Sequence, residues 1–240
     1  MSEVGLDWMD TEMDLEDALM DRPQVFKADG HPFRLYYPTL GMSLLANRTL
    51  PVLSLIKENE YMDMAILNLC MERPMEAIRF IAIHTIRGKS RLIDGNSIDD
   101  RSKQIAGLLN VEDTATLIKA ILRMSDAGRL IGHIGIEKDT RLLRKISEIR
   151  EDGTTVTVGG RSIYGRLVSL ACERYGWTPE YVVWEINLVS LRMMMADHVS
   201  TIHLTEEEVK KLRIDNGRDY INGDNPENAR LIKEMLQDGN

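Results

Sequence analysis

Residues 60–88, EYMDMAILNLCMERPMEAIRFIAIHTIRG, contain the pattern that decides the fold class. Apolar residues recur at helical spacing before Arg73, which predicts one helix up to that point. Pro74 suits the first position of a helix, so a second helix is predicted to start there. Gly88 is expected to end it. Two consecutive helices of this kind are typical of a mainly α protein.

On the amino-terminal side, the pattern predicts a hairpin followed by another helix. Residues 25–38, VFKADGHPFRLYYP, place turn-forming residues between two short apolar and aromatic runs, as in a small β-hairpin. Thr39 is then expected to cap a helix. Pro51 fits poorly inside a continuous helix, so a break is predicted there.

On the carboxy-terminal side, capping residues predict several further helices. Ser97 and Asn110 are expected to start two of them, and Gly128 is expected to end the second with a left-handed residue. Residues 130–136 alternate apolar residues with glycine and histidine, which suggests a linker or a short strand. Residues 138–150 have the pattern of a basic amphipathic helix.

A second hairpin is predicted at residues 151–163, EDGTTVTVGGRSI, because Thr and Val alternate up to two glycines. After it, we expect helices at 164–175 and 180–199, the latter capped by Thr178. Further helices are expected after a capping box at Thr205 and from Glu227. The predicted fold is a mainly α, multi-helix globular protein with one or two small β-hairpins. Its predicted parts are an acidic arm (1–24), an N-terminal helical domain (25–150) and a C-terminal part (151–240).

An acidic segment accounts for the net charge of the chain. The 240 residues include 30 Lys and Arg and 38 Asp and Glu, which gives a formal charge of −8. Residues 1–21 hold eight acids and no base, so the other 30 acids balance the 30 basic residues. A neutral body has no broad attraction for phosphate backbones, so nucleic-acid binding is disfavoured. The segment itself is consistent with a partner-docking helix, a solvated arm or a helix packed on its own body.

The sequence has no recognisable catalytic or cofactor-binding motif. Glycine-rich phosphate loops, the GxSxG elbow and CxxC pairs are all absent. His198 and His203 are five residues apart, whereas a helical metal pair needs a spacing of three or four. His84 is interpreted as a core histidine, and Glu185 as an acid that faces solvent or meets an arginine. We therefore expect no enzyme activity, no cofactor and no bound metal.

The location is expected to be cytoplasmic, with no membrane partner. No stretch approaches the roughly 18–20 apolar residues that a membrane span needs. The first residues lack the basic and apolar regions of a secretory signal. Cys70 and Cys172 lie far apart, so no disulfide framework is predicted.

Three groups of side chains are candidates for binding another protein. They are an aromatic cluster where the 180–199 helix starts, a run of methionines within that helix, and apolar residues of the acidic segment. Methionine adapts to varied partners, and exposed aromatic residues anchor interfaces, although both are also common in helix cores. The candidates are Trp177, Tyr181, Trp184, Met193, Met194, Met195, Trp8, Met9 and Met13.

Residues 160–197, GRSIYGRLVSLACERYGWTPEYVVWEINLVSLRMMMAD, resemble the C-terminal part of bacteriophage and prophage tail assembly chaperones. The matching positions are Gly176, Trp177, Thr178 and Pro179, which lie before an apolar helix. Residues 31–45 are compatible with the same family. The resemblance implies a non-enzymatic helper in the host cytoplasm. Such a helper binds the long helical tape-measure protein, keeps it soluble and assists the assembly of tail subunits around it.

Three alternatives remain open at this stage. The chain could be a structural virion component such as a tail connector. It could be an enzyme with a site assembled from distant residues such as His84, Glu185 and His198. It could also be a DNA-binding regulator that uses the helices of residues 111–136. Association with further copies of the chain is compatible with each alternative.

Overall fold

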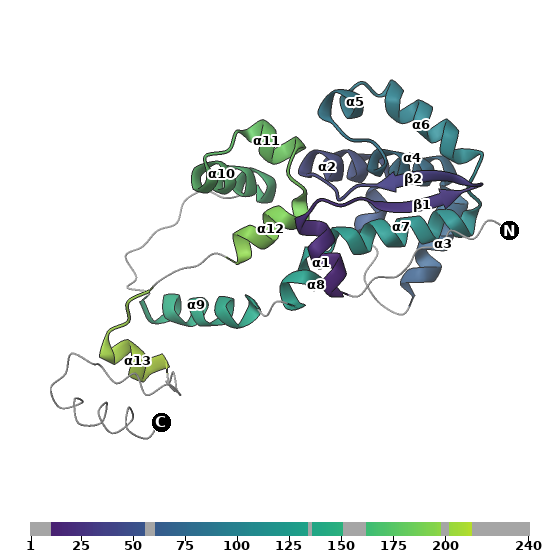
Figure 1. Cartoon of the computed structure of the whole chain (residues 1–240). Helices are drawn as coiled ribbons and strands as arrows, with labels where there is room; N and C mark the ends of the chain where they lie inside the picture. Colours follow the sequence, from purple (N-terminus) through teal and green to yellow (C-terminus); the bar gives the residue numbers. More distant parts are fainter. Residues whose placement is uncertain (1–10, 56–60, 134–135, 151–161, 198–201, 213–240) are drawn as a thin grey trace, which may run out of the picture. The chain divides into compact units, whose positions relative to one another are not determined.

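The fold is mainly α, as predicted. The computed structural model describes residues 11–55, 61–133, 136–150, 162–197 and 202–212. Within these ranges the chain forms thirteen α-helices, one 3₁₀ helix and one antiparallel pair of strands (Figure 1). The second predicted hairpin lies almost entirely outside the described residues, and Ile163, at its end, begins a helix instead.

Two compact units make up the chain. One comprises Met1–Asp139 and Val156–Val199, and the other comprises Thr140–Thr155 and Ser200–Asn240. The larger unit therefore includes residues 162–197, which the sequence prediction placed in a separate C-terminal part.

The hairpin of the larger unit forms where it was predicted. Strands β1 (Gln24–Ala28) and β2 (His31–Leu35) pair antiparallel, with Phe26 opposite Phe33. Asp29 and Gly30 both have positive φ, at 48° and 76°, as a tight two-residue hairpin turn requires. The two phenylalanine rings stack with their centroids 5.1 Å apart and are buried in the core. The hairpin thereby contributes one apolar face to the core.

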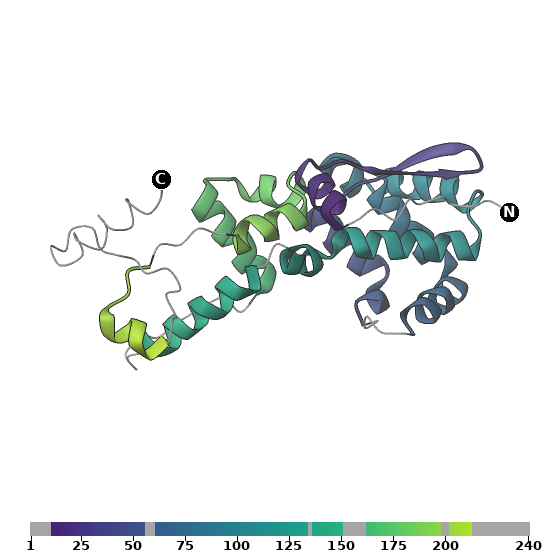
Figure 2. The same cartoon turned by 60° about the horizontal axis from the view of Figure 1, so that its bottom comes forward.

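Helix α4 (Pro74–His84) lies within this core, since seven of its eleven residues are buried. Helices α6 and α7 pack against it, and the Tyr36 amide beyond β2 donates to the His84 carbonyl oxygen at 2.8 Å. Figure 2 shows the hairpin on one side of α7 and helix α3 on the other. The neighbouring elements are α2 (Leu40–Thr49), η1 (Pro51–Leu55), α3 (Met62–Glu72), α5 (Lys89–Ile93), α6 (Asn96–Ala106) and α7 (Val111–Ser125).

Most predicted helix starts are confirmed by their caps. The Thr39 hydroxyl accepts from the Met42 amide at 3.2 Å, and the Asn110 side chain accepts from the Asp113 amide at 2.7 Å. Such bonds satisfy amides at the helix start that have no partner within the helix. Ser97 is an exception, because it lies inside α6, which starts one residue earlier after Gly95.

The linker or short strand predicted at residues 130–136 is wrong for residues 130–133 and 136, which are helical, while residues 134–135 lie outside the described ranges. Helix α7 ends at Ser125, and a new helix, α8 (Ala127–His133), follows directly. The Asp126 side chain accepts from the Arg129 amide at 3.0 Å, which starts the new helix. Gly128 lies within α8 and has no positive φ, so it does not form the predicted left-handed cap.

The predicted long helix at 180–199 is also wrong, because it is broken in two. Helix α10 (Ile163–Tyr175) ends at Gly176, whose φ is 68°, and α11 (Pro179–Trp184) starts after the Thr178 cap. A second cap, Asn187, then starts α12 (Leu188–Ala196) by accepting from the Ser190 amide at 2.7 Å.

The buried side chain of Asn187 also holds two distant segments together. Its Nδ2 donates to the Ala18 carbonyl oxygen at 2.9 Å, and Ser190 Oγ donates to the same oxygen at 2.8 Å. The Leu188 amide donates to the Pro38 carbonyl oxygen at 2.8 Å. The start of α12 is thus fixed against residues near both ends of the hairpin.

Part of the acidic segment forms a helix packed on the body of the same unit, one of the three predicted alternatives. Helix α1 (Thr11–Leu19) buries Asp14, Asp17 and Ala18. Asp14 Oδ2 accepts from Arg123 Nη2 at 2.9 Å and from Arg129 Nη2 at 2.6 Å. These bonds fix the acidic helix against α7 and α8.

The smaller unit contains most of α9 (Ile136–Arg150) and all of α13 (Glu206–Leu212). The predicted capping box is confirmed, because the Thr205 amide donates to Glu208 Oε2 at 2.7 Å and the Glu208 amide donates to Thr205 Oγ1 at 3.3 Å. Arg150 Nε donates to Glu208 Oε1 at 2.6 Å, which joins α9 to α13.

Replacing Asn187 with alanine is expected to lower the free energy of unfolding by about 2–3 kcal/mol, because it removes a cap and one partner of a buried carbonyl. Urea denaturation followed by tryptophan fluorescence measures the effect. Ser162→Ala, which removes an exposed cap bond to the Gly165 amide, is the matched control and is expected to cost about 1 kcal/mol. Equal losses in the two variants would show that the connections of Asn187 contribute nothing.

Replacing Asp14 with asparagine is expected to lower the free energy of unfolding by about 2 kcal/mol. The loss is smaller than for a fully buried ion pair, because the side chains of Arg123 and Arg129 are 32% and 26% exposed. The control is Asp63→Asn, because the Asp63 side chain is 72% exposed and lies 3.3 Å from Lys119. This change is expected to lower the free energy of unfolding by about 0.5 kcal/mol. The same urea titration distinguishes them, and a smaller loss for Asp14→Asn than for Asp63→Asn would contradict the anchoring role of Asp14.

Candidate functional site

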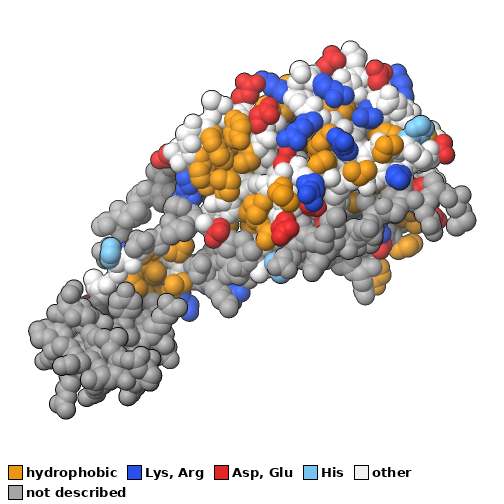
Figure 3. All heavy atoms as spheres, in the orientation of Figure 1, with side chains coloured by type: hydrophobic (Ala, Val, Ile, Leu, Met, Phe, Trp, Pro, Cys, Tyr) orange, Lys and Arg blue, Asp and Glu red, His pale blue; other side chains and the backbone are white. Residues whose placement is uncertain are grey.

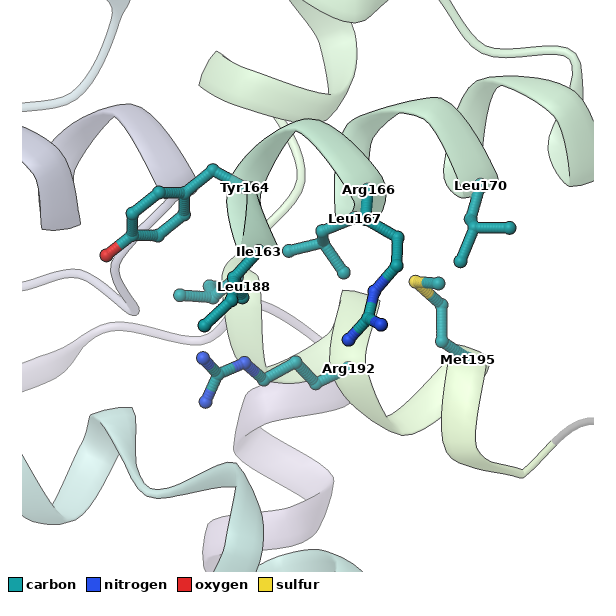
Figure 4. A pocket seen from close by; sticks show the side chains of 8 residues that line it. All are labelled: Ile163, Tyr164, Arg166, Leu167, Leu170, Leu188, Arg192 and Met195. Atoms are coloured by element: carbon teal, nitrogen blue, oxygen red, sulfur yellow. The ribbon is translucent and has the colours of Figure 1, made fainter. Parts of the chain in front are cut away.

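An open apolar groove lies between α10 and α12 of the larger unit. It has a volume of about 340 Å³. Figure 4 shows side chains from the two helices facing each other across it. Its lining consists of Ile163, Tyr164, Arg166, Leu167, Leu170, Leu188, Arg192 and Met195.

The spacing of these residues explains how each helix presents its lining. Ile163, Leu167 and Leu170 recur at steps of four and three along α10, so they share one face of that helix. On α12, Leu188, Arg192 and Met195 follow the same rule. Behind the groove, these helices pack with α2 and α11 around the buried Leu40, Ala171, Val182 and Leu191.

The groove keeps a considerable apolar surface in contact with solvent. Ile163 is 68% exposed, and Tyr164 and Leu170 are each 42% exposed. Figure 3 shows hydrophobic side chains gathered at the surface over α10. Clustered exposure of this kind on a helical surface is typical of a binding site for another molecule.

Two arginines supply the charge of the groove. Arg166 and Arg192 are both exposed, and the described part of the lining includes no acidic residue. In Figure 4, Arg166 reaches from α10 toward α12, while Arg192 extends from α12 toward Ile163. Neither arginine forms an ion pair with another residue that the structure describes. Within the described ranges, the groove therefore combines an apolar lining with two arginines that form no ion pair.

The predicted aromatic cluster is divided between two places. The Trp177 ring lies 4.6 Å from that of Tyr175 and 5.2 Å from that of Tyr181, measured between centroids. Trp184 instead lies over Gly41 of α2, so close that a Cβ added at Gly41 would overlap the tryptophan ring. Tyr181 is exposed, whereas both tryptophans are partly buried and pack against core residues. Among the described residues, Tyr181 has a ring contact with Trp177 but none with Trp184.

The three consecutive methionines point in different directions. Met193 is buried in the main core, Met194 is exposed, and Met195 lines the groove. Trp8 and Met9, the other apolar candidates, lie outside the described residues, and Met13 lies in α1. Of the predicted binding residues, Met195 is the one that the structure places in the groove.

The candidates for catalysis lie in different environments. His84 is buried and its Nδ1 donates to the Phe80 carbonyl oxygen at 2.8 Å, as expected for a core histidine. Burial lowers its pKa to about 4, and the hydrogen bond to Phe80 opposes this shift. Glu185 and His203 are exposed, and His198 lies outside the described residues. Among the residues that the structure describes, no group of three His, Cys, Asp or Glu side chains could hold a metal ion.

Most of the groove was missed from the sequence. The spacing of Ile163, Leu167 and Leu170 was visible, but it equally fits a buried helix face. The break at Asn187 was not recognised, and without it the face formed by Leu188, Arg192 and Met195 could not be placed opposite α10.

Comparisons with protein family models, with curated proteins and with solved structures found no match to this chain. Within the described ranges, every helix is too short or too polar to cross a bilayer.

The buried His84 is expected to make stability depend on pH. Its pKa is about 4 in the folded chain and near 6.5 when unfolded, so the unfolded chain binds the proton first as the pH falls. Between pH 6.5 and pH 4, protonation of this side chain should lower the free energy of unfolding by about 1.4 kcal/mol for each unit by which the pH falls. Urea denaturation from pH 7 to 4.5 should show a shallower dependence for His84→Asn than for the wild type. His31→Asn, at an exposed position, should keep the pH dependence of the wild type. If His84→Asn also kept it, the buried His84 would not be the source of this pH dependence.

Proposed function

We propose that this chain is a non-catalytic protein-binding factor that holds a helix of another polypeptide in the α10–α12 groove. The observation that carries the proposal is the groove itself: an apolar lining from two helices with Ile163, Tyr164 and Leu170 open to solvent. Helix-in-groove recognition needs such a surface and no reactive centre. Met195 at one end adds a flexible side chain that suits partners of varied shape.

The finer proposal is that the partner is a tape-measure protein and that the chain acts as a tail assembly chaperone. Support comes from the position of the resembling segment. The four matching positions lie outside the groove, but the resembling segment, residues 160–197, contains α10 and α12 and includes every described lining residue. A chaperone of this kind must cover long apolar helices before assembly, and an open apolar groove is suited to that task.

Replacing Leu170 with glutamate is expected to abolish partner binding, because a charge would enter the apolar lining of the groove. The test is co-expression of the full chain with the tape-measure protein encoded beside it, followed by co-purification and measurement of the soluble tape-measure fraction. The wild type should keep the partner soluble, and Leu170→Glu should reduce the bound fraction at least about tenfold. Met75→Glu, at a 57% exposed apolar residue outside the groove, is the matched control and should behave as the wild type.

The results separate the two levels of the proposal. Loss of binding in Met75→Glu but not in Leu170→Glu would move the binding surface away from the groove. A genome in which no tape-measure gene lies near the gene for this chain would overturn the tail-assembly assignment and leave the more general proposal of helix binding standing.

A further inference from the structure

We infer that the groove between α10 and α12 selects an acidic amphipathic helix of a partner protein, an inference that rests on the proposed function. The apolar side of this helix would cover Leu167, Leu170 and Leu188, and its carboxylates would meet Arg166 and Arg192. The proposal thus specifies the chemistry of the partner, which the apolar lining alone leaves open.

The charge of the groove is the first argument. Among the residues that the structure describes, its charged lining residues are two arginines from opposite walls. Some arginines elsewhere in the larger unit meet acids of the same chain, as Arg87 does with Asp21 at 2.5 Å, whereas others, such as Arg34 and Arg91, form no ion pair among the described residues. Arg166 and Arg192 have no such ion pair among the described residues. Because an arginine fork can donate two parallel hydrogen bonds to a carboxylate, this pair favours an acidic partner.

The second argument is that the molecule already uses this mode of recognition internally. Helix α1 is acidic, and it packs against the body with Asp14 between Arg123 and Arg129. Its apolar residues Leu15 and Ala18 contact the core on the same side. In this arrangement, two helices each supply one arginine to hold an acidic helix. Arg166 on α10 and Arg192 on α12 would hold an acidic helix of a partner in the same way.

The apolar lining argues against a nucleic acid as the occupant. Phosphate backbones bind clusters of basic and polar groups, and affinity grows with the number of phosphates neutralised. Here six of the eight described lining residues are apolar or aromatic, so a phosphate backbone would meet mostly hydrocarbon. A helix with leucines on one face and carboxylates at its edges satisfies both parts of the lining.

The test uses three fluorescent helical peptides with the same leucine face and with glutamate, glutamine or lysine at the flanking positions. Anisotropy titrations with the full chain at low salt should show the glutamate peptide binding about tenfold tighter than the glutamine peptide, and the lysine peptide weakest. Added salt should reduce this preference, since exposed pairs are screened.

The double variant Arg166→Gln with Arg192→Gln should remove the preference for the glutamate peptide. Arg34→Gln with Arg91→Gln, exposed arginines outside the groove, should keep it.

Each other outcome has a defined meaning. Equal binding of the glutamate and glutamine peptides, lost in Leu170→Glu, would overturn the acidic selectivity while supporting the proposed function. No binding of any peptide would overturn the inference, and the co-expression experiment would then decide the proposed function separately.

Sedimentation of the chain alone measures its oligomeric state and tests whether a second copy of the chain occupies the groove. A dimer that dissociates in the Arg166 and Arg192 double variant would make a second copy the occupant and overturn the inference of a separate partner.

Discussion

The larger unit depends on the hydrogen bonds of one buried amide, the side chain of Asn187. Its oxygen starts α12 and its nitrogen binds the carbonyl oxygen at the end of α1. The neighbouring Leu188 amide binds the segment after the hairpin. A buried carbonyl without a donor costs about 1–3 kcal/mol, so these bonds strongly favour one position for the start of α12. The direction of α12, and with it one wall of the groove, follows from that position.

Local signals were sufficient for much of the fold. Thr39, Asn110, Thr178 and the Thr205–Glu208 box act within one helical turn, so their effect is visible in a few residues of sequence. The hairpin turn at Asp29–Gly30 is local in the same sense. Because these caps and turns need no distant partner, the helical class and the hairpin could be predicted without knowledge of the packing.

The error at residues 180–199 arose where a tertiary contact competes with a local pattern. Residues 180–199 have a continuous apolar pattern, yet Asn187 interrupts it because its side chain gains partners near residue 18, far away in sequence. The same limit applies to the candidate site. Three adjacent methionines look alike in sequence, but only packing determines that Met193 is buried, Met194 exposed and Met195 in the groove. Helical spacing defines a face but not what that face contacts.

The charge pattern gains a different meaning once the fold is known. The acidic N-terminal segment gives the chain its net charge, yet three of its acids are engaged inside the molecule: Asp14 with two arginines, Asp17 with Arg22 and Asp21 with Arg87. Internal neutralisation of this kind reduces the ability of the segment to repel or attract other molecules at a distance. The two groove arginines, which form no ion pair with another described residue, then matter more for recognition than the overall charge. Specificity for a partner is therefore better judged from Arg166 and Arg192 than from the net charge of −8.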